Sequence, residues 1–327
     1  MADTGFRAWL KRVLDPVMPG MGSETLHARP AAILCMVLYI AGLATVRYWV
    51  PALQAKSLLW AHLGVGWLGC FGIIIAFHGF GALRCVTRRS VFVLAVAAVV
   101  LCTFWYFGRM DSYVRYWKPH LDQKAEYARL YGFMYFASCA VVLRLVLPVV
   151  ISRLVMGLRP SDLGLNARRN PSPPALRRIW PIYLGLFLLV LPAVIYAAGT
   201  PAFQAKYPLS RDMIHNGTIA LEHLVVFECF YLMVFVSGES FWRGFLTFGT
   251  ERDLGLYGLM FMIVPYVVAH YGKPLPETLG AIAAGFTLGW LALKHRSIWW
   301  GVALHYGVAL TMDLLAIYAR DLKIITG

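Results

Sequence analysis

Residues 180–199 read WPIYLGLFLLVLPAVIYAAG and contain no charged side chain. A helix needs about 20 consecutive, mainly apolar residues to cross the hydrocarbon core of a bilayer. This stretch meets that requirement over its full length, so it predicts a membrane-spanning helix.

Further apolar runs are distributed along the whole chain of 327 residues. Together with the first they cover residues 31–50, 57–83, 90–108, 130–157, 180–199, 218–237, 254–270, 278–293 and 297–318. Since the last three are short or interrupted, we expect about eight or nine spans in an all-α, polytopic transmembrane bundle. The composition agrees, because 60% of the residues are hydrophobic and 14% are charged, whereas soluble domains carry about 25% charged residues.

The basic residues indicate how the chain is oriented. The formal net charge is +14, but Lys and Arg lie mostly between apolar runs, which favours a membrane protein over a nucleic-acid partner. Four basic clusters fall on one side if the N-terminus is cytoplasmic, although the loop 109–129 is also basic. We therefore expect a multi-pass protein of a bacterial-type inner or plasma membrane, embedded in the lipid bilayer with its N-terminus inside. The clusters are Arg7, Lys11, Arg12 and Arg29; Arg84, Arg88 and Arg89; Arg159, Arg168, Arg169, Arg177 and Arg178; and Lys294 and Arg296.

One segment suggests an internal boundary. Residues 158–178 combine Pro, Ser, Asn and Arg, which favour loops over helices. They predict a basic linker between an N-terminal membrane block, residues 1–157 with about four spans, and a C-terminal domain, residues 179–327 with about five.

Ionisable residues inside the C-terminal spans mark the candidate site, because such groups are costly in a membrane and are functional by default. Glu239 and Arg243 are four residues apart, so an α-helix would put them on one face. The plain alternative is an ion pair that only holds a helix in place.

Two histidines and an acid follow in later spans. His270 ends an apolar run and precedes Gly272, so it is expected at a helix-to-loop turn, whereas His305 lies in the middle of an apolar helix. Asp313 is eight residues further on, about 12 Å along the axis, too far to share one metal ion with His305 without other ligands.

This set of residues permits hydrolysis. A carboxylate beside a histidine can deprotonate water, and a second histidine can stabilise an oxyanion. Alternatively Glu239, His270 and His305 match a catalytic zinc set with an open position, so a divalent metal such as zinc is a candidate cofactor. The chain has neither an HExxH helix nor a GxSxG serine signature. The sequence leaves both forms of water activation open.

At these positions the chain resembles the CPBP family, the CAAX prenyl endopeptidases and bacteriocin-processing intramembrane proteases also called the Abi family. The resemblance covers roughly residues 159–320. It rests on RPSDLGL at 159–165, ESFWRGFL at 239–246, the helix end at His270, and AGFTLGWLALKHRSIWWGVALHYG at 284–307. The family pattern is Glu-Glu-x-x-x-Arg, then Phe-x-x-x-His, then His-x-x-x-Asn or Asp.

The chain departs from this pattern at three places. Gly238 stands where the first acid of the pair is usual, Tyr266 replaces Phe, and Ala309 stands where Asn or Asp is expected. Asp313 is then the candidate substitute for the last position. Glu228 is a substitute acid, eleven residues and about three helical turns before Glu239.

The resemblance implies an intramembrane endopeptidase or metalloendopeptidase acting on a membrane-associated peptide or protein, either CAAX-like or a precursor. In this reading Glu239 is the base, His270 its partner and His305 an oxyanion or metal ligand. Arg243 orients Glu239, and Asp313 sets a histidine tautomer. Two alternatives remain at this point: a catalytically inactive relative that acts as a membrane scaffold or binding protein, and a proton-coupled transporter.

Overall fold

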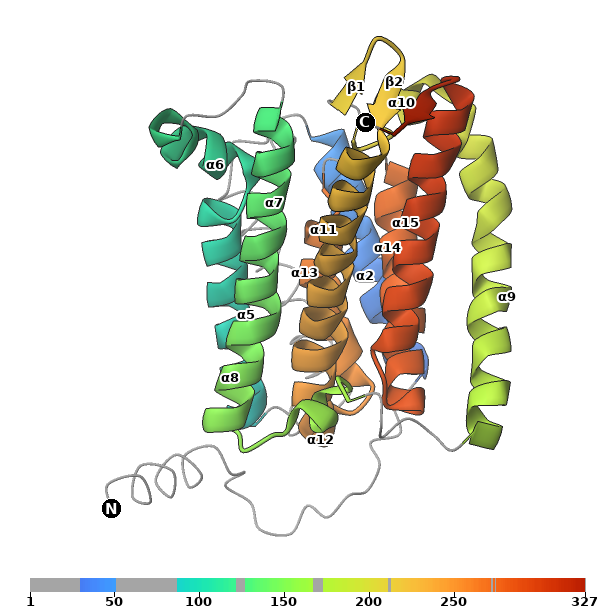
Figure 1. Cartoon of the computed structure of the whole chain (residues 1–327). Helices are drawn as coiled ribbons and strands as arrows, with labels where there is room; N and C mark the ends of the chain where they lie inside the picture. The colour runs from blue at the N-terminus through green and yellow to red at the C-terminus, as the bar shows by residue number, and fades with distance from the viewer. Residues whose placement is uncertain are drawn as a thin grey trace. The chain divides into compact units, whose positions relative to one another are not determined.

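The computed structural model describes residues 30–50, 87–121, 127–166, 173–210, 213–271, 273 and 275–326. Within them each predicted apolar run is mainly helical (Figure 1), although the run 218–237 begins with three residues of a strand. The predicted span 57–83 lies outside the described residues. Among the described residues, five helices are long and apolar enough to cross a membrane: Arg88–Phe107, Arg129–Leu154, Arg177–Ala198, Leu221–Leu254 and Trp299–Ala319. The all-α prediction is confirmed, and the count of eight or nine spans stays a prediction.

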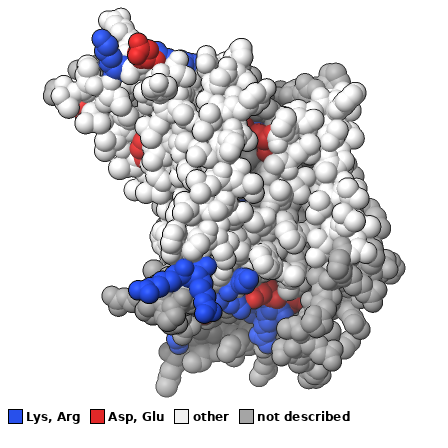
Figure 2. Space-filling model, turned by 90° about the vertical axis from the view of Figure 1, so that its right-hand side faces the viewer, with Lys and Arg blue, Asp and Glu red and all other residues white. Residues whose placement is uncertain are grey.

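The surface of the long helices is apolar. On α9 (Pro173–Ala198), Leu189 is 75% exposed and Tyr196 is 80% exposed. Such continuous apolar exposure is unfavourable in water and favourable against lipid tails. Figure 2 shows the same property on one face, where Lys and Arg gather in groups and most of the remaining surface is uncharged. The chain is an integral membrane protein.

The chain divides into two compact units, and each is made of separated segments. Unit 1 consists of Met1–Val99, Pro148–Asn166 and Phe241–Arg296. Unit 2 consists of Val100–Leu147, Ala167–Ser240 and Ser297–Gly327. The linker predicted at 158–178 holds the 3₁₀ turn η5 (Pro160–Leu163), and its role as a domain boundary stays a prediction.

Unit 1 is built on three helices that pack against one another, α2 (Pro30–Trp49), α13 (Tyr257–Val268) and α14 (Leu275–His295). Two glycines of α14 allow α13 to approach closely. A Cβ atom at Gly289 would lie 2.6 Å from Leu259, and one at Gly285 would lie 3.2 Å from Ile263. Small residues spaced four apart are a common means of packing membrane helices. Unit 1 also contains the shorter helices α8 (Leu147–Leu154) and α12 (Gly249–Leu254). The first residue of α8, Leu147, belongs to unit 2.

Unit 2 is a row of helices in which α11 is central. Helix α11 (Leu221–Glu239) packs on α7 (Ala128–Val141) and on α15 (Trp299–Ala319), and α15 packs on α9. Figure 1 shows them side by side in the order α7, α11, α15, α9. A π-helical turn, η4 (Val142–Val146), continues α7, and the short helices α6 (Met110–Tyr116), η2 (Lys118–His120) and α10 (Pro201–Gln204) lie between the long ones in sequence. α5 (Arg88–Phe107) is divided between the two units.

A small sheet at one end of this row was not predicted. β1 (Ile214–His215) and β2 (Thr218–Ala220) form a hairpin, and β3 (Lys323–Ile325) pairs with β2 in parallel. The two turn residues Asn216 and Gly217 have φ values of 50° and 77°. Positive φ at both positions is the requirement of the tightest hairpin turn, which Asn-Gly favours. The sheet joins the start of α11 to the chain end that follows α15.

Candidate active site

The centre of the site in unit 2 is a contact between an acid and a histidine. The Nδ1 atom of His305 lies 3.1 Å from Oε1 of Glu239. Glu239 is the last residue of α11 and is 1% exposed, whereas the His305 side chain on α15 is 31% exposed. Because an ionised carboxylate only accepts hydrogen bonds, His305 donates through Nδ1–H. This bond leaves Nε2 as the ring nitrogen that is available for other contacts.

The imidazole is also held from the adjacent turn of α11. The rings of Phe235 and His305 have centroids 4.7 Å apart at 59°. Phe235 precedes Glu239 by four residues on the same α-helix, so the two side chains project from one face. His305 therefore meets an aromatic ring and a carboxylate from successive turns, which fix both its position and its tautomer.

A glycine of α15 makes room for the carboxylate. A Cβ atom at Gly301 would lie 2.8 Å from Oε2 of Glu239. Gly301 and His305 are four residues apart, so both lie on the face of α15 that meets Glu239. The absence of a side chain at Gly301 is thus what lets the carboxylate lie against the α15 backbone.

A second polar cluster lies further along the same two helices. The Tyr306 hydroxyl donates to Oε2 of Glu228 at 3.1 Å. The Leu209 backbone N–H donates to Oδ1 of Asp313 at 3.0 Å, and the carboxyl groups of Asp313 and Glu228 are close enough to interact. Asp313 is 1% exposed. Glu228, the predicted substitute acid, and Asp313, the predicted substitute for the last motif position, are therefore brought together with each other.

Unit 1 contains the other two predicted site residues. Arg243 is fully buried, and its guanidinium lies 4.7 Å from the centroid of the Tyr266 ring. The ring of His270 meets the same tyrosine edge-on at 4.6 Å, and its Nδ1 contacts the Tyr266 carbonyl oxygen at 2.7 Å. His270 lies two residues after the end of α13, at the helix-to-loop turn that was predicted. Arg243 and His270 thus both contact the Tyr266 ring, and we call these three residues the Tyr266 cluster.

The two groups are linked along the chain by an irregular helical segment. Residues Ser240–Phe248 (η8) form a π-helix, which continues α11 directly after Glu239. A π-helix has i→i+5 hydrogen bonds and is frequently found at functional sites. Since four residues do not complete a turn of such a helix, the spacing of Glu239 and Arg243 does not by itself put them on one face. The meeting of His270 or Arg243 with Glu239 stays a prediction.

The predicted zinc ligands are Glu239, His270 and His305. Catalytic zinc takes three protein ligands and one open position. No group of three His, Cys, Asp or Glu side chains within the described ranges is arranged to hold a metal ion. Glu239 and His305 supply two possible ligands. Their direct hydrogen bond joins His305 Nδ1 and Glu239 Oε1, two atoms that could otherwise coordinate a metal ion. The three-ligand zinc set of Glu239, His270 and His305 stays a prediction.

Several supporting residues were missed by sequence reasoning. Gly301, Phe235 and Tyr306 each contact a predicted residue, and Tyr266 was noted only as a departure from a motif. A signal for two of them was present, because Phe235 and Gly301 both lie four residues before a predicted site residue. Helical spacing around each candidate would have identified them.

Comparison with known proteins agrees with this reading of the motifs. Residues 220–311 match the family model described as type II CAAX prenyl endopeptidase Rce1-like. The matched segment contains Glu239, Arg243, His270 and His305, and it confirms the resemblance to the CPBP family there. No curated protein and no solved structure matches the chain. The family match supports a CAAX-type intramembrane protease whose substrate is a membrane-embedded peptide.

Proposed function

We propose that the protein is an intramembrane endopeptidase that hydrolyses a peptide bond in a membrane-associated peptide, CAAX-like or a precursor, with water activated by Glu239 and His305. The observation that carries the proposal is the 3.1 Å contact between His305 Nδ1 and Glu239 Oε1. The match of residues 220–311 to a peptidase family supports the class of reaction.

The difference in exposure supports a division of roles in which His305, rather than the predicted Glu239, is the base. Glu239 is buried and His305 is about one-third exposed, so the imidazole is the member of the pair that water and substrate reach. His305 Nε2 takes a proton from water while the water oxygen attacks the carbonyl carbon of the scissile bond. Glu239 holds the ring in the required tautomer and stabilises the imidazolium that forms, as the acid of a Ser-His-Asp triad does.

The second half of the reaction returns the proton. The imidazolium of His305 protonates the departing nitrogen when the carbon–nitrogen bond breaks, which yields a carboxylic acid and an amine. We propose His270 as the group that stabilises the oxyanion. Because its Nδ1–H donates to the Tyr266 carbonyl oxygen, this role requires the imidazolium form, in which Nε2–H is the donor to the oxyanion. This differs from the prediction in which His270 was the partner of Glu239, since His305 has that contact. We also propose, as the family resemblance implies, that Arg243 orients Glu239.

The test is cleavage of a bilayer-anchored peptide by the purified full chain in liposomes. We expect Glu239→Gln and His305→Ala each to reduce kcat by at least about 100-fold, the usual contribution of a general base. Matched controls are Glu222→Gln, an exposed acid in the first turn of α11, and His215→Ala, an exposed histidine in β1. His270→Ala tests the oxyanion role in the same assay.

The assay also separates the active enzyme from the alternatives. Wild-type rates in the Glu239→Gln and His305→Ala variants would contradict the proposal. A wild-type protein that cleaves no anchored peptide while binding it through an intact site would instead favour the inactive scaffold.

A further inference from the structure

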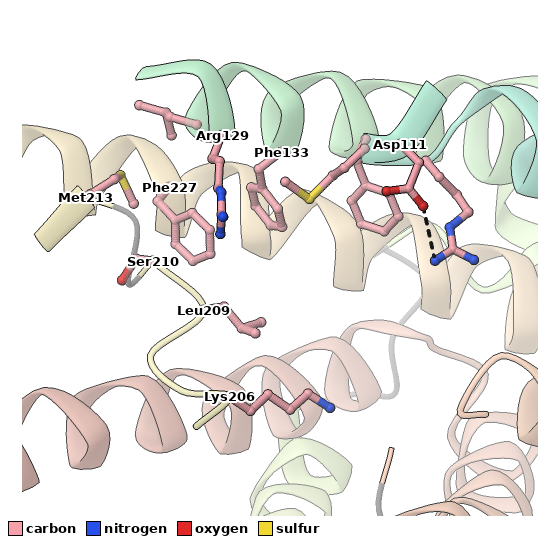
Figure 3. Close-up of a pocket in the computed structure, with 12 residues that line it drawn as sticks. Asp111, Arg129, Phe133, Lys206, Leu209, Ser210, Met213 and Phe227 are labelled. Carbon is pink, nitrogen blue, oxygen red and sulfur yellow. Dashed lines mark ion pairs between the residues drawn. The ribbon is translucent and has the colours of Figure 1, made fainter. Parts of the chain in front are cut away.

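A cavity outside the family motifs is the strongest unassigned feature of unit 2. It has a volume of about 510 Å³, within the range of small-molecule sites. It is lined by Arg109, Met110, Asp111, Arg129, Leu130, Phe133, Phe136, Lys206, Leu209, Ser210, Met213 and Phe227. Figure 3 shows that these residues come from separate parts of the chain.

The charges of the cavity favour an anion. Among the described residues, the cavity is lined by three cations, Arg109, Arg129 and Lys206, and by one acid, Asp111. Asp111 lies 3.9 Å from Arg109, and its side chain is 85% exposed, so it neutralises little of that charge in water. In Figure 3 the Arg129 side chain extends beside the Phe133 and Phe227 rings toward the segment of Leu209 and Ser210.

The cations lie at the same level relative to the bilayer. Arg109 follows the candidate span Arg88–Phe107 by two residues, and Arg129 is the first residue of the next candidate span. Lys206 follows the span that ends at Ala198. Because consecutive spans cross in opposite directions, the three positions are all on one side of the membrane, at the boundary with water.

The walls of the cavity continue into the apolar layer. Phe133 and Phe136 are four and seven residues beyond Arg129 on α7, which is about 6 to 10 Å deeper along the helix. Phe227 is six residues into α11, and its ring stacks on Phe133 with a centroid distance of 4.4 Å. The cavity is thus cationic at the membrane surface and aromatic below it.

We propose that this cavity binds the headgroup of an anionic phospholipid from the surrounding bilayer, with the start of an acyl chain against Phe133 and Phe227. Basic side chains at the level of the headgroups attract anionic lipids. The ligand also lies beside Leu209, whose backbone N–H holds Asp313, so the lipid stabilises the segment that supports α15.

The experiment measures binding and thermal stability of the purified full chain in neutral detergent. The probes are short-chain phosphatidylglycerol, phosphatidylcholine of the same chain length, and inorganic phosphate. We expect phosphatidylglycerol alone to raise Tm, since a ligand that binds only the folded state stabilises it. In Arg129→Gln/Lys206→Gln the dissociation constant should increase by at least about tenfold, as expected for lost charge-assisted contacts.

The matched control is Arg115→Gln/Lys118→Gln. It removes two cations from α6 and η2, on the same side of the membrane, that do not line the cavity. Control binding equal to wild type supports the proposal. Equal binding of phosphatidylcholine, or equal weakening in both double variants, would overturn it. Inorganic phosphate that binds as tightly as phosphatidylglycerol would also overturn it, because the site would then serve a soluble anion.

Discussion

Gly301 and Glu239 are in such close contact that even a methyl group at position 301 would lie 2.8 Å from Oε2 of the carboxylate. This relationship connects the backbone of α15 to the buried acid of the site. It means that the position of the Glu239 carboxylate depends on a residue that has no functional group.

The first prediction follows from this contact. In Gly301→Ala the new methyl group pushes the Glu239 carboxylate away from His305, so kcat should fall by about 10- to 100-fold, the effect of a misplacement of about 1 Å. Cleavage of an anchored peptide measures it. Gly307→Ala is the matched control on α15, because the nearest atom to its Cβ is 3.8 Å away. Equal rates in the two variants would show that the carboxylate has room to move.

The second prediction concerns the cluster of Glu228, Tyr306 and Asp313. Tyr306→Phe removes the hydroxyl that donates to Glu228, and it should lower the free energy of unfolding by about 1 to 3 kcal/mol, because a partly buried carboxylate loses its donor. Thermal denaturation in detergent reports the change. The matched control is Tyr318→Phe, also on α15 and 84% exposed. A Tyr306→Phe protein as stable as this control would contradict the prediction.

The third prediction separates positioning from catalysis at Asp313. Its contacts are with Leu209 and Glu228, so we expect Asp313→Asn to lower stability and to leave the pH profile of kcat unchanged. Asn retains a carbonyl oxygen that accepts from Leu209 N–H, whereas Ala does not, so stability should fall further in Asp313→Ala. A shifted pH profile in Asp313→Asn would instead support the predicted catalytic role.

The fourth prediction tests the Tyr266 cluster of unit 1, which consists of Arg243, Tyr266 and His270. Arg243→Lys keeps the charge but loses the planar group that covers the Tyr266 ring. We expect a loss of about 1 to 2 kcal/mol in the free energy of unfolding, the size of a buried cation–π contact. Arg252→Lys is the control, since Arg252 is exposed in α12. The prediction fails if the two variants unfold at the same temperature.

The fifth prediction concerns metal dependence. If water is activated by Glu239 and His305 alone, protein freed of metal by a chelator should cleave its substrate at the rate of untreated protein. Elemental analysis must accompany the rate measurement, with Glu239→Ala as the control. Activity that is lost on chelation and restored by zinc would support the predicted ligand set of Glu239, His270 and His305 instead.

The helices could be predicted because the bilayer imposes their length and apolar composition. The run at 297–318 and the helix Trp299–Ala319 agree within two residues at each end. The small sheet could not be predicted in the same way, because strands of two or three residues are too short to show an alternating pattern. Its signal was the Asn216-Gly217 pair, a favoured turn sequence.

The candidate site was predictable as a set of residues but not as a set of contacts. Glu239 and His305 were identified because charged groups inside apolar runs are costly. Their direct pairing depends on the side from which α15 packs on α11, and that depends on many apolar contacts that have no individual signature. The π-helix at Ser240–Phe248 was likewise not predictable, because the change from i→i+4 to i→i+5 bonding is set by packing rather than by a residue type.

The pairing of β2 with β3 has a mechanical consequence. It fastens the start of α11 to the end that follows α15, with Thr218 opposite Lys323, while Glu239 and His305 fasten the same helices near their other ends. Two helices that are connected at both ends resist sliding and rotation relative to each other. A displacement of α15 by one helical turn, about 5.4 Å, would have to break both the strand pairing and the acid–histidine contact. The pairing of β3 with β2 therefore helps to keep the proposed catalytic pair aligned.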